Sequence, residues 1–168
     1  MQQHRIEITE SDVKYLRELL ACLAVRPGAD QDTRELLRHK LDRAYIVPPN
    51  QVGGHVMTLQ SRAVVKDDDT WESTVYTLVD PGHADHDAAR LSILTPMGIA
   101  LLGRREGDFV EWDVLGGTAR VWIQKVLYQP EAAGHEHLKY SVRRTDSPLR
   151  AESEMQQIGG KSHADTNW

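Results

Sequence analysis

The stretch LSILTPMGIALLGRREGDFVEWDVLGG (residues 91–117) constrains the fold most, because it specifies several elements in a fixed order. It opens with a short apolar run that is typical of a strand. Thr95 followed by Pro96 is typical of a helix start, since a threonine oxygen can accept from first-turn amides and proline fits the first helical position. Gly103 favours a helix end, where a positive φ is common. We therefore predict a short helix at 96–102, directly after a strand.

Alternation of apolar and polar residues predicts further strands around this short helix. The predicted strands are residues 56–66, 71–79, 109–114 and 118–128. Gly116-Gly117 is a strong hairpin signal between the last two. The aspartates at 67–69 separate the first two, and we interpret them as a solvated turn, because a metal loop spreads its ligands around a bending glycine. Together these elements predict an antiparallel sheet with a short helix, in a protein of the α+β class.

The first fifty residues follow a helical period instead. Apolar residues recur at three- and four-residue steps between positions 13 and 23, and again between positions 33 and 41. The short break at 26–29 forces two successive helices to run antiparallel. We therefore predict a helical hairpin, in effect a short coiled coil, over residues 9–46, and we expect it to end before Pro48.

The change of period divides the chain into segments. We predict a helical hairpin over residues 1–50, a sheet domain over 51–134 and a polar extension over 135–168. The extension has few apolar residues after Ser147, so we expect it to be largely disordered.

Three acidic residues lie near the predicted tip of the hairpin: Asp30, Asp32 and Glu35. Either aspartate can cap the second helix, and Glu35 has the spacing of a capping box with Asp32. Acidic side chains at this position also suit the positive end of a helix dipole. We therefore interpret all three as helix-capping residues, and a functional role at the tip is the alternative.

The charge of the chain limits its partners. With 25 acidic against 20 basic residues, the formal net charge is −5. This balance argues against binding to bare nucleic acid, which needs a basic face, but it allows binding to a protein that itself handles nucleic acid. No apolar run approaches the roughly 18 residues of a membrane helix, and the N-terminal residues lack the apolar core of a secretory signal. We expect a cytoplasmic monomer without direct contact to nucleic acid or membrane.

The side chains that can bind metals or react do not form a complete set. Residues 83–87 include two histidines and two aspartates, but no further pair at metal-site spacing completes a ligand set. Cys22 is the only cysteine, and we predict that it is a small packed residue among leucines. The sequence shows no nucleophile beside a base and no phosphate loop. We therefore expect no cofactor, no metal and no catalytic residue.

Several of these segments also carry a family resemblance. TPMGIALLGRREGDFVEWDVLGG (95–117), followed by VLYQPEAAG (126–134), is similar to the C-terminal domain of Gre transcript-elongation factors. LDRA (41–44), MTLQSR (57–62) and TLVDP (77–81) also fit. Within that superfamily the chain resembles the Rnk-type regulators of nucleoside diphosphate kinase. The match is specific because its motifs occur in order at the expected spacing.

The resemblance implies a fold and a docking site. The domain of that superfamily is FKBP-like, with an antiparallel sheet wrapped against a short helix. In Gre factors the loop before this helix touches the rim of the secondary channel of RNA polymerase, and the matching residues here are Leu94, Thr95, Pro96 and Met97. Leu94 stands where Gre factors often carry an acid, so a charged contact there is not expected. Acidic residues at the tip of the Gre coiled coil help to hold the second catalytic magnesium of the polymerase.

The resemblance also implies a function. We expect a non-catalytic regulator that binds RNA polymerase and competes with Gre factors without stimulating transcript cleavage, because a predicted hairpin of about 22 Å is shorter than the Gre coiled coil. One alternative is a prolyl isomerase or folding helper, because FKBP-like folds can host that activity. A second alternative is direct binding to nucleoside diphosphate kinase.

Overall fold

The computed structural model describes residues 4–26, 28 and 30–139. The predicted disorder of the extension therefore falls almost wholly outside the described residues. Residues up to Glu136 belong to one compact unit, and His137 begins a second. The first unit combines helices with a mixed sheet, which confirms the predicted α+β class.

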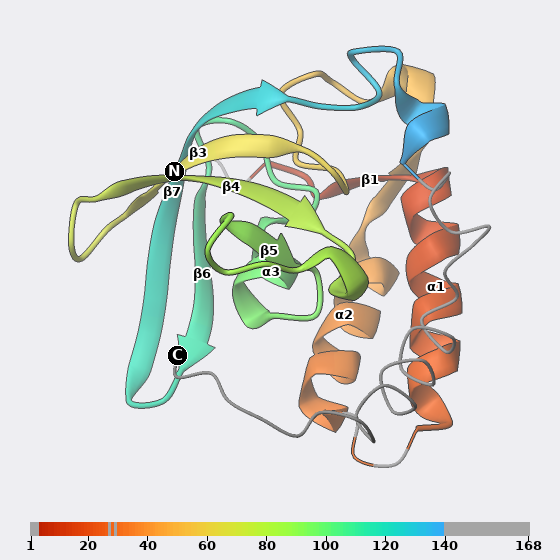
Figure 1. Ribbon diagram of the computed structural model, residues 1–168, viewed down its shortest axis with the longest axis horizontal. Helices are drawn as coiled ribbons and strands as arrows, with labels where there is room; N and C mark the ends of the chain where they lie inside the picture. The colour runs from red at the N-terminus through yellow and green to blue at the C-terminus, as the bar shows by residue number, and fades with distance from the viewer. Residues whose placement is uncertain (1–3, 27, 29, 140–168) are drawn as a thin grey trace, which may run out of the picture. The chain divides into compact units, whose positions relative to one another are not determined.

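The N-terminal part is the predicted helical hairpin. It consists of α1 (Glu10–Ala24) and α2 (Gln31–Arg43), which lie side by side (Figure 1). Apolar side chains of the predicted stripes are fully buried in the unit, among them Leu16 and Leu37. Cys22 is exposed, so the prediction that it is packed was wrong. The buried stripe of α1 runs through Val13, Leu16 and Leu19, and the helical period places Cys22 away from it.

A small parallel sheet closes the base of the hairpin. It pairs β1 (Glu7–Thr9) with β2 (Tyr45–Val47), and Ile8 lies opposite Ile46. The hairpin was predicted to run to residue 46, but α2 ends at Arg43 because Ala44 is extended. A proline at position 48 disfavours helical backbone just before it, which suits a strand that ends at Val47.

The main sheet has five strands in the order β5-β4-β3-β7-β6 (Figure 1). The strands are β3 (Arg62–Asp67), β4 (Ser73–Val79), β5 (Arg90–Ser92), β6 (Phe109–Val114) and β7 (Gly117–Tyr128). Neighbouring strands from β4 to β6 are antiparallel, as predicted. The edge strand β5 instead joins β4 in parallel, so the sheet is mixed. The 80–89 loop makes this possible, because it brings the chain back along β4 before β5 begins.

The first predicted strand starts later than expected. Val56 makes only an isolated bridge to Arg105, and regular pairing begins at Arg62. In between, the Ser61 side chain accepts a hydrogen bond from the Thr58 backbone N–H at 3.0 Å, and Gln60 has a φ of 67°. Such side-chain-to-backbone bonds compete with strand pairing, which explains why alternation alone misplaced this boundary.

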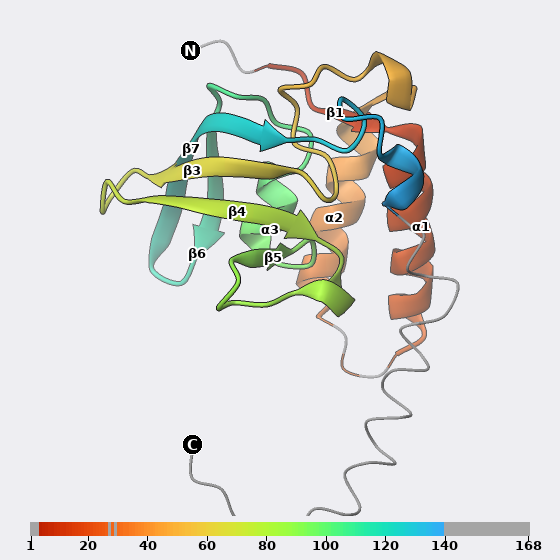
Figure 2. The same ribbon diagram turned by 45° about the horizontal axis from the view of Figure 1, so that its top comes forward.

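The short helix α3 (Pro96–Leu101) fills the inside of the curled sheet. Figures 1 and 2 show it between the main sheet and α2. The helix contributes Ile99 and Leu101 to the core, which also includes Val65, Val110 and Ile123 from the inner face of the sheet. Among the described residues, no helix is long and apolar enough to cross a membrane.

Polar contacts attach the hairpin to the sheet. Asp12 of α1 accepts a hydrogen bond from the Leu59 backbone N–H at 3.0 Å, and the Glu7 N–H donates to the Gly103 carbonyl at 3.1 Å. The boundary predicted at residue 50 lies inside one compact unit, and it separates the hairpin with its small sheet from the main sheet. Whether the two segments are separate folding units stays a prediction.

Candidate functional site

The four predicted docking residues form one short surface segment, which we call the docking loop (Leu94–Met97). The loop follows β5, whose exit is fixed by a 2.8 Å hydrogen bond from the Ile93 N–H to the Val79 carbonyl. Pro96 is exposed, and the other three residues are half-buried. The structure thus brings all four residues together at the start of α3.

Thr95 holds the docking loop in place. Its hydroxyl oxygen accepts from the Gly98 N–H at 3.0 Å and donates to the Ser92 carbonyl at 2.7 Å. Thr95 is therefore the predicted cap of α3, with Pro96 in the first turn. These bonds fix the backbone on either side of Pro96. Thr95 therefore both caps α3 and holds Pro96 in its exposed position.

Gly98 is a supporting residue that sequence reasoning missed. A Cβ at this position would fall against the Ser92 carbonyl oxygen and only 3.0 Å from its carbon. The helix and the end of β5 can approach each other this closely only because the side chain is absent. The available signal was a glycine within an apolar helical run, where alanine is otherwise the better helix former.

The prediction that all three acids at the hairpin tip cap α2 is correct for only one of them. Asp30 is the cap of α2: its carboxylate accepts from the Asp32 N–H at 3.0 Å and from the Thr33 hydroxyl at 2.5 Å. The Thr33 hydrogen bond is the main cause that lowers the pKa of the Asp30 carboxyl. Glu35 does not form a capping box with Asp32, because the cap is Asp30 and Asp32 lies inside the helix. The Glu35 carboxylate instead accepts from the Gln31 side chain at 3.0 Å. Only one of the three acids is therefore a cap.

The acids and the docking loop are separate in the structure. No hydrogen bond or ion pair between described residues joins Asp30, Asp32 or Glu35 to the docking loop. All three acids are exposed in the N-terminal part of α2, whereas α2 contacts α3 through Lys40. From Asp32 to Lys40 the helix advances by about 12 Å. We therefore treat the acids and the docking loop as two separate surfaces.

Lys40 is a buried cation at the joint between the hairpin and α3. Its ammonium donates to the Ala100 carbonyl at 2.7 Å, and only 9% of the residue is exposed. Burial lowers the pKa of Lys40 well below its ordinary value, and the positive charge of Arg104 lowers it further. A carbonyl near the C-terminus of a helix is a favourable partner for a cation. The contact links α2 to the helix that follows the docking loop.

We expect Lys40 to make stability depend on pH. Its pKa is depressed in the folded protein but near 10.4 in the unfolded chain. Below the folded-state pKa, Lys40 is charged in both the folded and the unfolded protein, so burying the charge lowers the unfolding free energy by its full amount. Between the two pKa values the unfolded chain holds more protons, so the unfolding free energy rises with pH until about 10.4. Replacing Lys40 by methionine should remove this rise.

The measurement is the unfolding free energy of wild type and Lys40→Met by urea titration at several pH values from 7 upward. The difference between the two proteins should shift in favour of the wild type as pH increases. Lys14→Met removes an exposed lysine of α1 and controls for the change in net charge. A difference that stays constant with pH would show that Lys40 remains charged in its buried position.

Several side chains of metal-ligand type bond to neighbouring residues of their own loops. His83 bonds to the Asp80 carboxylate at 2.7 Å, and the Asp85 carboxylate accepts from the Asp87 N–H at 3.0 Å. In the 67–69 turn, Asp67 accepts from two following backbone N–H groups, which lowers the pKa of its carboxyl. Within the described residues, no three His, Cys, Asp or Glu side chains are grouped so that they could hold a metal ion.

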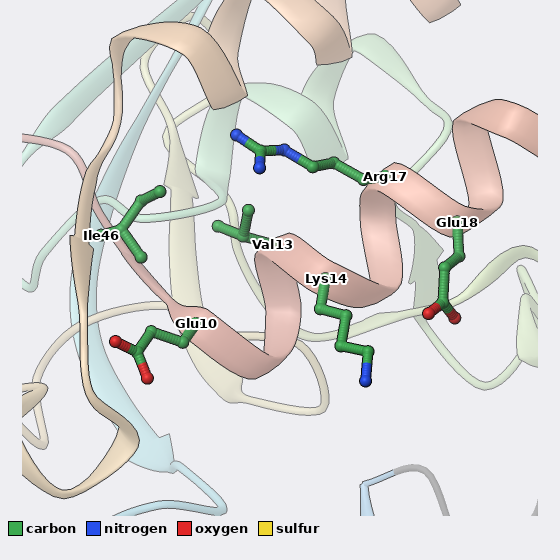
Figure 3. Close-up of a pocket in the computed structure, with 6 residues that line it drawn as sticks. All are labelled: Glu10, Val13, Lys14, Arg17, Glu18 and Ile46. Atoms are coloured by element: carbon green, nitrogen blue, oxygen red, sulfur yellow. The ribbon is translucent and has the colours of Figure 1, made fainter.

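One open depression lies along α1, beside Ile46 of β2 (Figure 3). Its lining residues are Glu10, Val13, Lys14, Arg17, Glu18 and Ile46. Charges of both signs surround a small apolar floor, so the depression selects neither an anion nor a cation. Sequence reasoning did not identify it, because Ile46 reaches it from β2, which was not predicted.

Comparisons with known proteins show the family and the fold of the chain. The model of the family described as transcription elongation factor GreA/GreB, C-terminal, matches residues 53–128. A solved structure of a GreA/GreB elongation factor from Nitrosomonas europaea superposes with a TM-score of 0.59 at 35% identity. The match covers 74% of this chain and 100% of that one.

Two curated proteins are similar to this chain in sequence. The regulator of nucleoside diphosphate kinase from Escherichia coli is 38% identical over 101 residues, which is 60% of this chain and 74% of the relative. The elongation factor GreA from Beijerinckia indica is 34% identical over 93 residues, 55% of this chain and 59% of that protein. The docking loop and the main sheet both lie within the residues that the family model matches.

Proposed function

Since the chain belongs to the family of GreA/GreB transcription elongation factors and their Rnk-type relatives, we propose that it is a non-catalytic regulator that binds RNA polymerase near the secondary channel. It competes there with Gre factors and does not stimulate transcript cleavage. Its relatives are named as regulators and elongation factors, which supports a regulatory role. The observation that carries the proposal is the combination of a Gre-type domain with a short helical hairpin.

The binding part of the proposal rests on the docking loop. Pro96 is exposed at the start of α3, and the cap formed by Thr95 fixes the backbone around it. A loop held by hydrogen bonds of its own loses little freedom when a partner binds, so more of the contact energy appears as affinity. The half-buried side chains of Leu94 and Met97 make this an apolar contact surface with no charge of its own.

The non-cleaving part rests on length. The helices have 15 and 13 residues, which at 1.5 Å per residue gives about 22 and 20 Å. Contact with α3 through Lys40 leaves only the first part of α2 to project toward a partner. Assistance to a metal-dependent step requires the carboxylate beside the ion, and a shortfall of several ångströms removes it.

We expect that carboxylate removal at the tip changes nothing in a cleavage assay. A suitable variant combines Asp30→Asn with Asp32→Asn and Glu35→Gln, because asparagine still caps α2. A backtracked elongation complex should cleave its transcript at the background rate with either the wild type or this variant. Both proteins should also reduce cleavage stimulated by an added Gre factor. Cleavage stimulated by the wild type alone and lost in the variant would refute the proposal.

A docking-loop variant tests binding separately. Pro96→Asp puts a charge on the exposed loop but keeps a residue that suits the first turn of a helix. We expect it to weaken binding to purified RNA polymerase about tenfold, as for other interface anchors. Leu115→Asp makes the same charge change at a fully exposed residue of the β6–β7 turn and should bind as the wild type does. Equal binding by all three proteins would exclude the docking loop.

The name of the Escherichia coli relative supports a second candidate, direct regulation of nucleoside diphosphate kinase. The same three proteins can be tested against purified kinase. Binding to the kinase without binding to the polymerase would favour this candidate over the first.

A further inference from the structure

The outer face of the main sheet carries a row of aromatic side chains. Phe109, Trp122 and Lys66 lie opposite one another on β6, β7 and β3. The rings of Phe109 and Trp122 are stacked, with centroids 6.0 Å apart and 16° between their planes. The Lys66 ammonium lies 4.3 Å from the centroid of the Trp71 ring, in the β3–β4 turn. We call Phe109, Trp122, Lys66 and Trp71 the aromatic row.

Two rings of the aromatic row are exposed, whereas Trp122 and Lys66 are half-buried. Trp71 is 70% exposed and Phe109 is 42% exposed, and beside them Val75 is 43% exposed. Trp71 also has a φ of 63°, an unfavourable conformation for a bulky residue. A tryptophan at position 71 is therefore explained neither by burial in the core nor by the backbone conformation there. The opposite face of the same sheet packs around α3, so the aromatic row and the docking loop are separate surfaces (Figures 1 and 2).

Acidic residues surround the aromatic row. The segments 66–73 and 109–120 together contain six acidic and only two basic residues. Arg120 is paired with Glu111 and lies 3.5 Å from Asp68. Asp69 and Glu72 are exposed, on either side of Trp71 in the sequence, and neither carboxylate makes an ion pair among the described residues. The rim therefore carries excess negative charge beside accessible rings.

We propose that the aromatic row and its acidic rim bind an arginine-containing basic segment of a partner protein. A guanidinium stacks on an aromatic ring and bonds to carboxylates in a planar fork, so both parts of this surface fit it. Within the molecule, Lys66 already places a cation over Trp71. Stacked rings also suit nucleic-acid bases, but phosphates would meet the acidic rim at a cost. The proposal does not depend on binding to RNA polymerase through the docking loop.

The test uses a fluorescein-labelled peptide of five Arg-Gly repeats and its Lys-Gly counterpart, with fluorescence anisotropy at 0.15 M NaCl. The arginine peptide should bind more tightly than the lysine peptide. Trp71→Asn removes the ring, and asparagine tolerates the positive φ. Asp69→Asn with Glu72→Gln removes two rim charges. Each change should weaken binding of the arginine peptide about fivefold, the effect of one cation–π or partly desolvated charge contact.

Two controls separate this surface from overall charge. Glu10→Gln with Glu18→Gln removes the same charge from α1, and Leu115→Asn removes an exposed apolar side chain from the β6–β7 turn. Both should leave binding unchanged. Equal losses in the rim and α1 variants would overturn the proposal, as would equal binding by every variant. It would also be overturned if the Trp71-dependent ligand were a single-stranded RNA oligonucleotide or a second copy of the chain.

Discussion

Gly98→Ala is expected to lower the free energy of unfolding by about 3 kcal/mol, the upper range for overpacking a buried site. The new methyl group would meet the backbone carbonyl of Ser92, which cannot move without breaking its hydrogen bond to Thr95. For a chain of this size the loss corresponds to a decrease in melting temperature on the order of 10 °C. Helix propensity alone predicts the opposite sign, because alanine is the better helix former by about 1 kcal/mol.

Gly117→Ala is the matched control. Gly117 begins β7, and a Cβ there meets nothing within 4 Å. The same chemical change should therefore stay within about 0.5 kcal/mol of the wild type. Urea unfolding followed by circular dichroism measures both variants. If Gly98→Ala were as stable as Gly117→Ala, the end of β5 would have to move freely away from α3, contrary to the contacts described above.

Asp12→Ala is expected to have the second large effect, a loss of about 3 kcal/mol. Asp12 is fully buried in α1, and its carboxylate accepts from the Leu59 N–H at 3.0 Å. Alanine would remove a charge-assisted bond and leave a buried donor without its acceptor. The bond joins the hairpin to the loop before β3. Its removal should therefore weaken the attachment of the hairpin to the rest of the unit.

Hydrogen exchange at the Leu59 amide reports this bond directly. The protection of this amide against exchange should decrease strongly in Asp12→Ala, because the amide then has no hydrogen bond to the Asp12 carboxylate that must break before exchange. Asp12→Asn keeps an oxygen acceptor of the same size and should retain more protection and stability. Asp32→Ala removes an exposed aspartate and should have a small effect. Undiminished protection of Leu59 in Asp12→Ala would contradict the assignment of this contact.

Much of the fold was predictable because local patterns and tertiary packing agree. The threonine-proline start of α3, the glycine turn between β6 and β7 and the period of the two helices each act within a few residues. The elements that were missed depend on distant partners. The pairing of β1 with β2 joins two three-residue strands, and neither is long enough to show alternation in the sequence.

The candidate site was predictable to a lesser degree. The capping role of Thr95 follows from its own sequence neighbourhood, and the structure confirms it. Glu35 had the spacing of a capping box, but a competing bond from Gln31 holds it. Lys40 could not be assigned in advance, and the glycine at position 98 indicated a constraint without showing its cause. Their importance comes from the Ser92 and Ala100 carbonyls, which belong to other elements and meet them only in the folded chain.

Residues 4–7 bond to the segment 103–108, which precedes β6, and these bonds have a consequence for synthesis on the ribosome. Glu7 bonds to the Gly103 carbonyl and to the Arg105 side chain, and His4 bonds to Asp108 at 2.6 Å. Residues 4–7 leave the ribosome just before the hairpin, yet their partners arrive about a hundred residues later. Contacts of such long sequence separation form slowly. During translation the nascent hairpin must therefore wait with its apolar stripe uncovered, and this interval is when chaperones have access to it.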